Sequence, residues 1–211
     1  MENLMKAREN QAKTIIKNLE KRNMTAFYCE SKEACRDKVL EIIGDGKSVS
    51  WGGTMSMKQC GIAEALAENP TVTILDRAKQ PADKMKEFFK EVSVCDYYIM
   101  GTNAITLDGE LVNIDGNGNR LASLIFGPEH VIVIAGMNKV STDVPEALHR
   151  VRNIASPPNT VRLNKNTPCA VDGRCHDCMS PDCICNQVVI TRRSREKERI
   201  IVLLVNDNLG F

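Results

Sequence analysis

The chain has 211 residues, 43% of them hydrophobic and 26% charged, which is typical of a globular protein and excludes a chain too polar to fold. Its 28 lysines and arginines nearly balance 27 aspartates and glutamates, so a net charge of +1 offers no overall field to attract nucleic acid or anionic lipid. The longest apolar runs, 131–137 and 200–205, are far shorter than the ~20 residues that cross a bilayer. The first residues lead into charged positions rather than a signal peptide, so we expect a cytoplasmic protein.

Helix and strand patterns alternate in the first half of the chain. Residues 3–21 place their apolar side chains on one face, which predicts a helix. The elements expected after it are a strand at 25–29, a helix from Ser31 to Gly44, a strand at 47–51, a helix from Thr54 to about Ala67 and a strand at 71–75.

The second half continues this alternation and adds antiparallel features. Pro81 suits the first turn of a helix that reaches Val92, and Asp108-Gly109 suits the turn of a hairpin. A helix from Ser141 should end before Pro157-Pro158. The other expected elements are strands at 96–100, 104–106, 111–114 and 130–135, a helix at 119–126, and two terminal strands, 187–191 and 199–205, paired through a charged loop.

This order of elements predicts an α/β fold with a mainly parallel sheet flanked by helices. The hairpin contributes antiparallel pairing, and residues 157–186 form a Cys-rich loop excursion. With no internal repeat and no low-complexity linker, a single domain over residues 1–211 is the simplest organisation.

Two glycine-bearing junctions stand where a predicted strand runs into a predicted helix. One spans residues 48–56 and contains Gly52-Gly53-Thr54, and the other spans 113–120 and contains Gly116-Asn117-Gly118. Backbone amides at such a turn, with a helix N-terminus behind them, suit a phosphate or carboxylate, and Arg120 would add donors. A tight turn without a ligand is the alternative. The glycines do not have the GxGxxG spacing, so no nucleotide cofactor is predicted.

Carboxylates near these junctions are the candidates for acid–base or nucleophilic chemistry. Glu110 and Asp115 could act as base or nucleophile if a cleft makes use of their charge, whereas Asp108 is expected to shape its turn. The three histidines are far apart in sequence and give no Ser-His-Asp arrangement.

A family resemblance covers nearly the whole chain. The motifs that carry it are Val49-Ser-Trp-Gly-Gly-Thr54, Gly101-Thr-Asn-Ala-Ile-Thr106, Gly109-Glu-Leu-Val-Asn113, Asp115-Gly-Asn-Gly-Asn-Arg120 and Leu209-Gly-Phe211. Together they resemble the LUD-domain family, the lactate-utilisation proteins. The resemblance implies a fold like that of sugar-phosphate isomerases, glucosamine-phosphate deaminases and CoA transferases. It also implies a link to the oxidation of lactate to pyruvate beside an iron–sulfur subunit.

The resemblance also points to site residues, because glycine turns after the strands contact phosphate or CoA in that fold group. The catalytic carboxylate motifs of the isomerases and CoA transferases have no convincing counterpart here. The candidate ligand-binding residues are Ser50, Gly52, Gly53, Thr54, Asn103, Asn113, Gly116, Asn117, Gly118, Asn119 and Arg120.

Five of the nine cysteines fall within 17 residues: Cys169, Cys175, Cys178, Cys183 and Cys185. The Cys-x2-Cys pair can hold one ion, and two more thiolates would complete a zinc site or a cubane cluster. Reduced structural thiols and a redox dithiol are the alternatives. The other four cysteines lie near apolar elements and are interpreted as small hydrophobes.

The resemblance narrows the cysteine assignment. Position 183 is often basic in similar sequences, which leaves Cys169, Cys175, Cys178 and Cys185 as the expected metal ligands. Zinc and an iron–sulfur cluster both fit the spacing, and the implied link to electron transfer favours the cluster.

We therefore expect a protein that binds a small anionic metabolite and contributes to lactate or related organic-acid oxidation. The alternatives are a non-catalytic accessory or metal-binding subunit of an iron–sulfur oxidoreductase, and an isomerase or transferase acting on a phosphorylated or CoA-linked substrate. An iron–sulfur oxidoreductase subunit is the expected protein partner, nucleic acid and membrane are not, and a homo-oligomer is left open.

Overall fold

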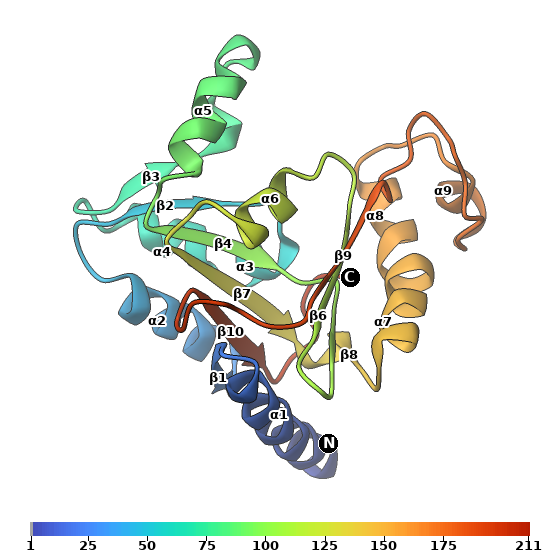
Figure 1. The fold of residues 1–211 in the computed structure, drawn as a ribbon, viewed down its shortest axis with the longest axis horizontal. Coiled ribbons are helices and arrows are strands. Elements are labelled where there is room, and N and C mark those ends of the chain that lie inside the picture. The colour runs from blue at the N-terminus through green and yellow to red at the C-terminus, as the bar shows by residue number, and fades with distance from the viewer. Residues whose placement is uncertain (1) are drawn as a thin grey trace.

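A computed structural model describes residues 2–211 and contains a six-stranded, fully parallel sheet (Figure 1). Its long apolar runs form the middle strands, as expected for strands that are buried on both faces. Ile132 pairs with Ile99 on one side and with Ile201 on the other. In sheet order the strands are β1 (Thr25–Cys29), β10 (Ile200–Val205), β7 (His130–Gly136), β4 (Tyr97–Gly101), β2 (Ser48–Trp51) and β3 (Thr73–Leu75).

Helices cover both faces of this sheet, and each face has its own apolar core. One core packs α1 (Glu2–Lys21), α5 (Met85–Val92) and α6 (Asn119–Ile125) against the sheet. The other packs α2 (Lys32–Ile43), α3 (Met55–Gln59) and α4 (Ile62–Ala67). Single 3-10 turns at η1 (Arg77–Lys79) and η2 (Ala82–Lys84) lead into α5, and a third, η3 (Met137–Lys139), follows β7.

A second, four-stranded sheet stands beside the first. The predicted hairpin is confirmed, because β5 (Ala104–Thr106) pairs antiparallel with β6 (Leu111–Asp115). The edge strands are β8 (Val140–Ser141), parallel to β5, and β9 (Gln187–Thr191), antiparallel to β6. The predicted α/β class with a mainly parallel sheet is confirmed, and the single-domain organisation stays a prediction.

The prediction that Pro157-Pro158 ends a helix is wrong. Helix α7 (Val144–Arg150) continues through a π-helical turn (Val151–Ala155) into α8 (Ser156–Arg162), and the prolines occupy the first turn of α8. Proline has no backbone N–H, so it is tolerated where that group would have no partner. The wider π-helical turn before α8 leaves such positions in the first turn of α8. The side chain of Asp143, rather than Ser141, caps α7. Helix α9 (Pro168–Asp172) follows in the excursion.

Two further expectations need correction. The terminal strands do not pair with each other, because β9 joins the small sheet while β10 inserts between β1 and β7. The helix expected from Thr54 to Ala67 is two helices, separated at Gly61, whose φ of 67° is left-handed. The scattered cysteines Cys29, Cys35, Cys60 and Cys95 are buried, as expected of small hydrophobes. Within residues 2–211, none of the helices combines the length and the apolar character needed to span a bilayer.

Candidate functional site

A cavity of about 460 Å³ opens at the carboxyl ends of the parallel strands, and we call it the strand-end cavity. Its walls come from the segments that follow β2 and β4, from the turn between β6 and α6, from Lys139 after β7, and from α8 and the residues beyond it. Parallel strands end at one edge of a sheet, so loops distant in sequence meet there. The last two residues, Gly210 and Phe211, close one side.

Both predicted glycine junctions reach this cavity. The two junctions approach closely, because an added Cβ at Gly52 would lie 3.4 Å from Cδ of Arg120. The predicted site residues that line the cavity are Gly53, Thr54, Asn103, Asp115, Gly116, Asn117, Asn119 and Arg120.

The remaining predicted residues lie outside the cavity lining. Ser50 is buried and donates to the carbonyl of Leu75. Gly118 has a left-handed φ of 80° as the residue before α6, a conformation that favours glycine. Gly52 has room for no side chain, since a Cβ there would lie 3.0 Å from the hydroxyl of Tyr98. Asn113, which is fully buried, accepts a hydrogen bond from Arg120.

Glu110 lies at the hairpin turn, away from the strand-end cavity. One carboxylate oxygen is 2.7 Å from Nη2 of Arg22, and the other accepts a hydrogen bond from the hydroxyl of Thr106. One oxygen thus joins the hairpin to the residue that follows α1, and the other forms a bond within the hairpin.

Arg120 lines the cavity and bonds to several segments of its wall. Its guanidinium donates to the carbonyls of Gly101 and Ile114 and to the side-chain oxygens of Asn113 and Asn103, at 2.8–3.1 Å. Burial lowers its pKa, although a guanidinium remains charged at neutral pH. These bonds tie the end of β4 to the end of β6, so Arg120 contributes charge to the cavity while most of its donors hold the walls together.

Lys139 is a buried cation with donors to spare. The residue is only 5% exposed, and its ammonium donates to the hydroxyl of Ser56 at 3.1 Å. No carboxylate of residues 2–211 lies within ion-pair distance of it. Burial, and then the charges of Arg150 and Arg120, lower the pKa of Lys139 to about 7.

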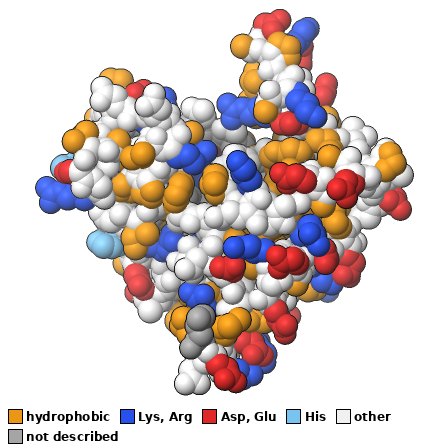
Figure 2. Space-filling model, turned by 180° about the vertical axis from the view of Figure 1, so that it is seen from behind, with side chains coloured by type: hydrophobic (Ala, Val, Ile, Leu, Met, Phe, Trp, Pro, Cys, Tyr) orange, Lys and Arg blue, Asp and Glu red, His pale blue; other side chains and the backbone are white. Residues whose placement is uncertain are grey.

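Positive charge dominates the strand-end cavity. Five cationic residues line it, namely Arg77, Arg120, Lys139, Arg162 and Lys165, against the carboxylates of Asp115 and Asp182. Asp182 pairs with Lys165 at 3.5 Å, and Asp115 is 3.6 Å from Nε of Arg120. Figure 2 shows lysine and arginine side chains in the hollow between the two lobes at the top of that view. The excess of cations favours an anionic ligand.

Only one of the two carboxylate oxygens of Asp115 has a partner in the protein. Its second oxygen, Oδ2, is buried and has no hydrogen-bond partner among the described residues. A buried carboxylate oxygen without a hydrogen bond is costly, so Oδ2 of Asp115 offers an acceptor position that no described residue fills.

Sequence reasoning missed Lys139, Ser56, Arg77, Arg162 and Lys165. A lysine three residues beyond an unbroken apolar strand was the available signal, since that position places it at the ligand-binding edge. The arginine and lysine of the α8 region carried no such signal, because they reach the cavity only through the continued helix.

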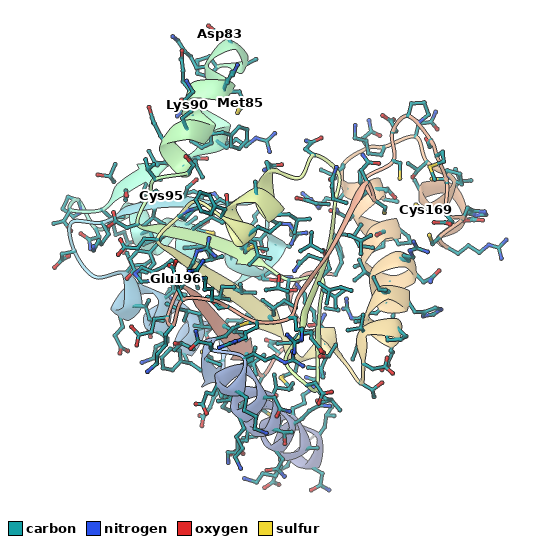
Figure 3. All side chains as sticks on the ribbon, viewed as in Figure 1. Asp83, Met85, Lys90, Cys95, Cys169 and Glu196 are labelled. Carbon is teal, nitrogen blue, oxygen red and sulfur yellow. The ribbon has the colours of Figure 1, made fainter. Side chains whose placement is uncertain are left out.

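A second cavity, of about 270 Å³, lies in the excursion, and all five clustered cysteines line it. We call it the cysteine cavity. Figure 3 marks Cys169 on α9, with further sulfur atoms in the neighbouring loop. No three histidine, cysteine, aspartate or glutamate side chains of residues 2–211 are grouped closely enough to hold a single ion as they stand.

Hydrogen-bond donors surround the cysteine sulfurs. The sulfur of Cys175 accepts from the backbone N–H of Asp177 at 3.4 Å, and that of Cys183 from the N–H of Cys185 at 3.4 Å. The hydroxyl of Thr167 lies 3.3 Å from the sulfur of Cys169. Polar groups thus contact three of the five clustered sulfurs.

The two cavities share a wall. Ile114, Ser156, Cys183, Ile184 and Asn186 line both of them. The backbone joins this wall to the small sheet, because the N–H of Asn186 donates to the carbonyl of Asp115 at 3.0 Å. A ligand in one cavity is therefore next to whatever occupies the other.

One comparison with known proteins shows the family, and another shows a similar fold. A DUF162 family protein from Deinococcus radiodurans has a similar structure, with a TM-score of 0.55 and 11% identity over 94% of this chain and 97% of that one. Ribose 5 phosphate isomerase A from Neisseria gonorrhoeae has a TM-score of 0.37 and 19% identity over 54% of each chain. No curated protein matches the sequence. The LUD domain family model matches residues 12–205, and the chain belongs to the LUD domain family.

Proposed function

We propose that this LUD domain protein binds a small organic acid in the strand-end cavity and serves in its oxidation. The ligand class is a hydroxy acid such as lactate, with a carboxylate for the cations and a hydroxyl for Asp115. The observation that carries the proposal is the buried ammonium of Lys139, which faces the cavity without a carboxylate partner.

A buried ammonium is costly unless an anion accompanies it. The fold nevertheless encloses Lys139 between Ser56 and Gly210, with Arg120 and Arg150 close enough to oppose its charge. A carboxylate bound beside Lys139 would supply the missing partner. Such strain at a cavity is expected where a protein is built for a ligand rather than for maximal stability.

The ligand's hydroxyl has a matching acceptor. Asp115 lines the same cavity and has a carboxylate oxygen without a hydrogen bond. Oxidation of a hydroxy acid to the keto acid breaks the O–H and Cα–H bonds and removes two electrons and two protons. Asp115 would accept the hydroxyl proton, and a partner subunit would have to supply the two-electron acceptor that takes the Cα hydrogen as hydride. An iron–sulfur cluster could then carry the electrons away one at a time.

The binding test measures lactate, glycerate and inorganic phosphate by calorimetry with the wild type and with Lys139→Met. We expect the affinity for the hydroxy acids to fall at least tenfold in the variant, about 1.4 kcal/mol or more, because methionine fills the space without the charge. At pH 8 the wild type should also take up protons on binding, since the anion favours the charged lysine.

Lys165→Met is the matched control. Lys165 lines the same cavity, but it already pairs with Asp182 and is partly exposed, so its loss should change the affinity less than threefold. Equal affinity of Lys139→Met and the wild type for every acid tested would contradict the proposal. Tight binding of phosphate alone would move the ligand class to phosphorylated substrates.

A further inference from the structure

The five cysteines of the excursion divide into two groups by the cavity that they face. Cys169, Cys175, Cys178 and Cys185 line the cysteine cavity and not the strand-end cavity, whereas Cys183 lines both. Cys175 also borders a third cavity, beside α7. Four thiols kept apart from the strand-end cavity is the number that a four-cysteine centre requires. The fifth lies in the shared wall.

We propose that the cysteine cavity holds an iron–sulfur cluster, bound by Cys169, Cys175, Cys178 and Cys185. The placement of the thiols favours a cluster over a single ion, because all five cysteines line one cavity of about 270 Å³ while no three metal-binding side chains of residues 2–211 are grouped closely enough to hold one ion. Four thiolates around zinc would lie ~2.3 Å from one centre and leave no open space between them. A cluster places several irons and sulfides between its thiolates, and therefore needs sulfurs arranged around a cavity.

The environment of the sulfurs agrees with this assignment. Cys175 accepts a backbone N–H, Cys169 is beside the hydroxyls of Thr160 and Thr167, and Cys185 lies 3.4 Å from the hydroxyl of Ser156. Hydrogen bonds to the sulfurs are among the means by which proteins set the reduction potential of such clusters.

The excursion also lacks the apolar packing that would hold it in place. None of residues 170–186 is buried, and beyond α9 the segment 173–186 forms neither helix nor strand. Val171 and Met179 are 85% and 94% exposed. A loop of this length needs another source of order, and bonds from four thiolates to one cluster would supply it.

The shared wall sets the position of the cluster relative to the proposed substrate, a point that rests on the proposed function. Ser156 of α8, the segment from Cys183 to Asn186 and the end of β6 separate the two cavities. The cluster would therefore lie next to an acid bound beside Lys139, where it could carry single electrons away from the site. Cys183, in the wall, is assigned no ligand role.

The test uses the full chain, purified without oxygen and then incubated with ferrous iron and sulfide. We expect about four irons and four sulfides per chain and visible absorbance that dithionite bleaches. Incubation with Zn²⁺ alone is the competing arm. Uptake of one zinc with exclusion of iron, or iron below half an equivalent per chain, would overturn the proposal.

Cys185→Ser and Cys183→Ser form a matched pair, two residues apart in the same loop. Cys185→Ser should lose more than half of the iron, and Cys183→Ser should retain it. Equal losses would overturn the ligand assignment. Cys178→Ser provides a second ligand variant if Cys185→Ser does not fold, with circular dichroism as the check. Calorimetry with lactate on iron-free protein tests the proposed function separately, so the failure of one does not hide the other.

Discussion

The two cavities lie side by side but are built in different ways. The strand-end cavity is lined by loops that leave the ends of buried strands, and Arg120 joins those ends through hydrogen bonds to both sheets. The cysteine cavity is lined by a loop in which no residue from 170 to 186 is buried. One cavity is a consequence of the fold, and the other, under the proposal made above, would keep its shape through a bound group.

This difference shows in which cavity ligand binding and protein stability depend on different residues. In the strand-end cavity the ligand-facing group, Lys139, opposes stability, while its neighbour Arg120 supports it. In the cysteine cavity the same thiols would bind the cluster and order the segment. Substitutions should therefore have global effects in the first and local effects in the second.

The largest effect is expected from Arg120→Met. The substitution removes the donors to four oxygens and leaves Asp115 without its cation in a buried setting. We expect unfolding free energy to fall by about 3–5 kcal/mol, measured by urea denaturation.

Arg77→Met is the control for Arg120→Met. Arg77 lines the same cavity but is exposed and lies over the ring of Phe89, so the loss should stay within about 1 kcal/mol. A stable Arg120→Met variant that has lost only ligand binding would show that Arg120 binds the ligand and is not needed to hold the cavity walls together.

The next effect is the pH dependence that Lys139 confers on the ligand-free protein. The folded-state pKa of about 7 lies below the usual 10.5, so the unfolded chain holds the extra proton between these values. The free energy of unfolding should therefore rise between these two pH values, by up to about 1.4 kcal/mol per pH unit. Below pH 7 the cost of burying the ammonium is fully present.

Lys139→Met isolates this contribution. The variant should be more stable than the wild type at pH 7, and the difference should shrink toward pH 10 in thermal or urea unfolding. A constant difference across that range would mean that Lys139 is neutral or solvated throughout.

The sequence predicted the large sheet and most of its helices because their signals are local. The apolar run of β7 and the Ser31 and Gly44 ends of α2 are read from neighbouring residues alone. The second sheet was only partly predictable, since β9 pairs with β6 from more than 70 residues away. The end of α7 was misjudged because a π-helical turn removes the usual conflict between proline and a helix.

The parts of the candidate site at strand ends marked by glycines were predictable from the sequence. Side chains that reach the cavity from segments distant in the sequence were not. Gly53 and Gly116 stand in conspicuous turns, and both line the strand-end cavity. Lys139 follows a strand without a glycine signal, and its significance comes from burial, which only the fold reveals. Glu110 looked as suitable for chemistry as Asp115, but it pairs with Arg22, which follows α1 and lies 88 residues earlier in the chain.

The smallest global effect, and the sharpest local one, is expected from Cys175→Ser. The serine cannot replace a thiolate ligand, so the excursion should loosen while both cores of the main sheet remain packed. Global unfolding free energy should change by less than about 1 kcal/mol. Limited trypsin digestion of iron-loaded protein should show faster cleavage between residues 159 and 186, first at Arg174, whose side chain is 74% exposed.

Cys183→Ser, loaded in the same way, should be cleaved at the wild-type rate because its thiol is not a ligand. Unchanged cleavage in Cys175→Ser, together with less than one equivalent of metal in the wild type, would make the five cysteines ordinary reduced thiols. The cysteine cavity would then owe its shape to backbone contacts such as that between Asn186 and Asp115, as the strand-end cavity does.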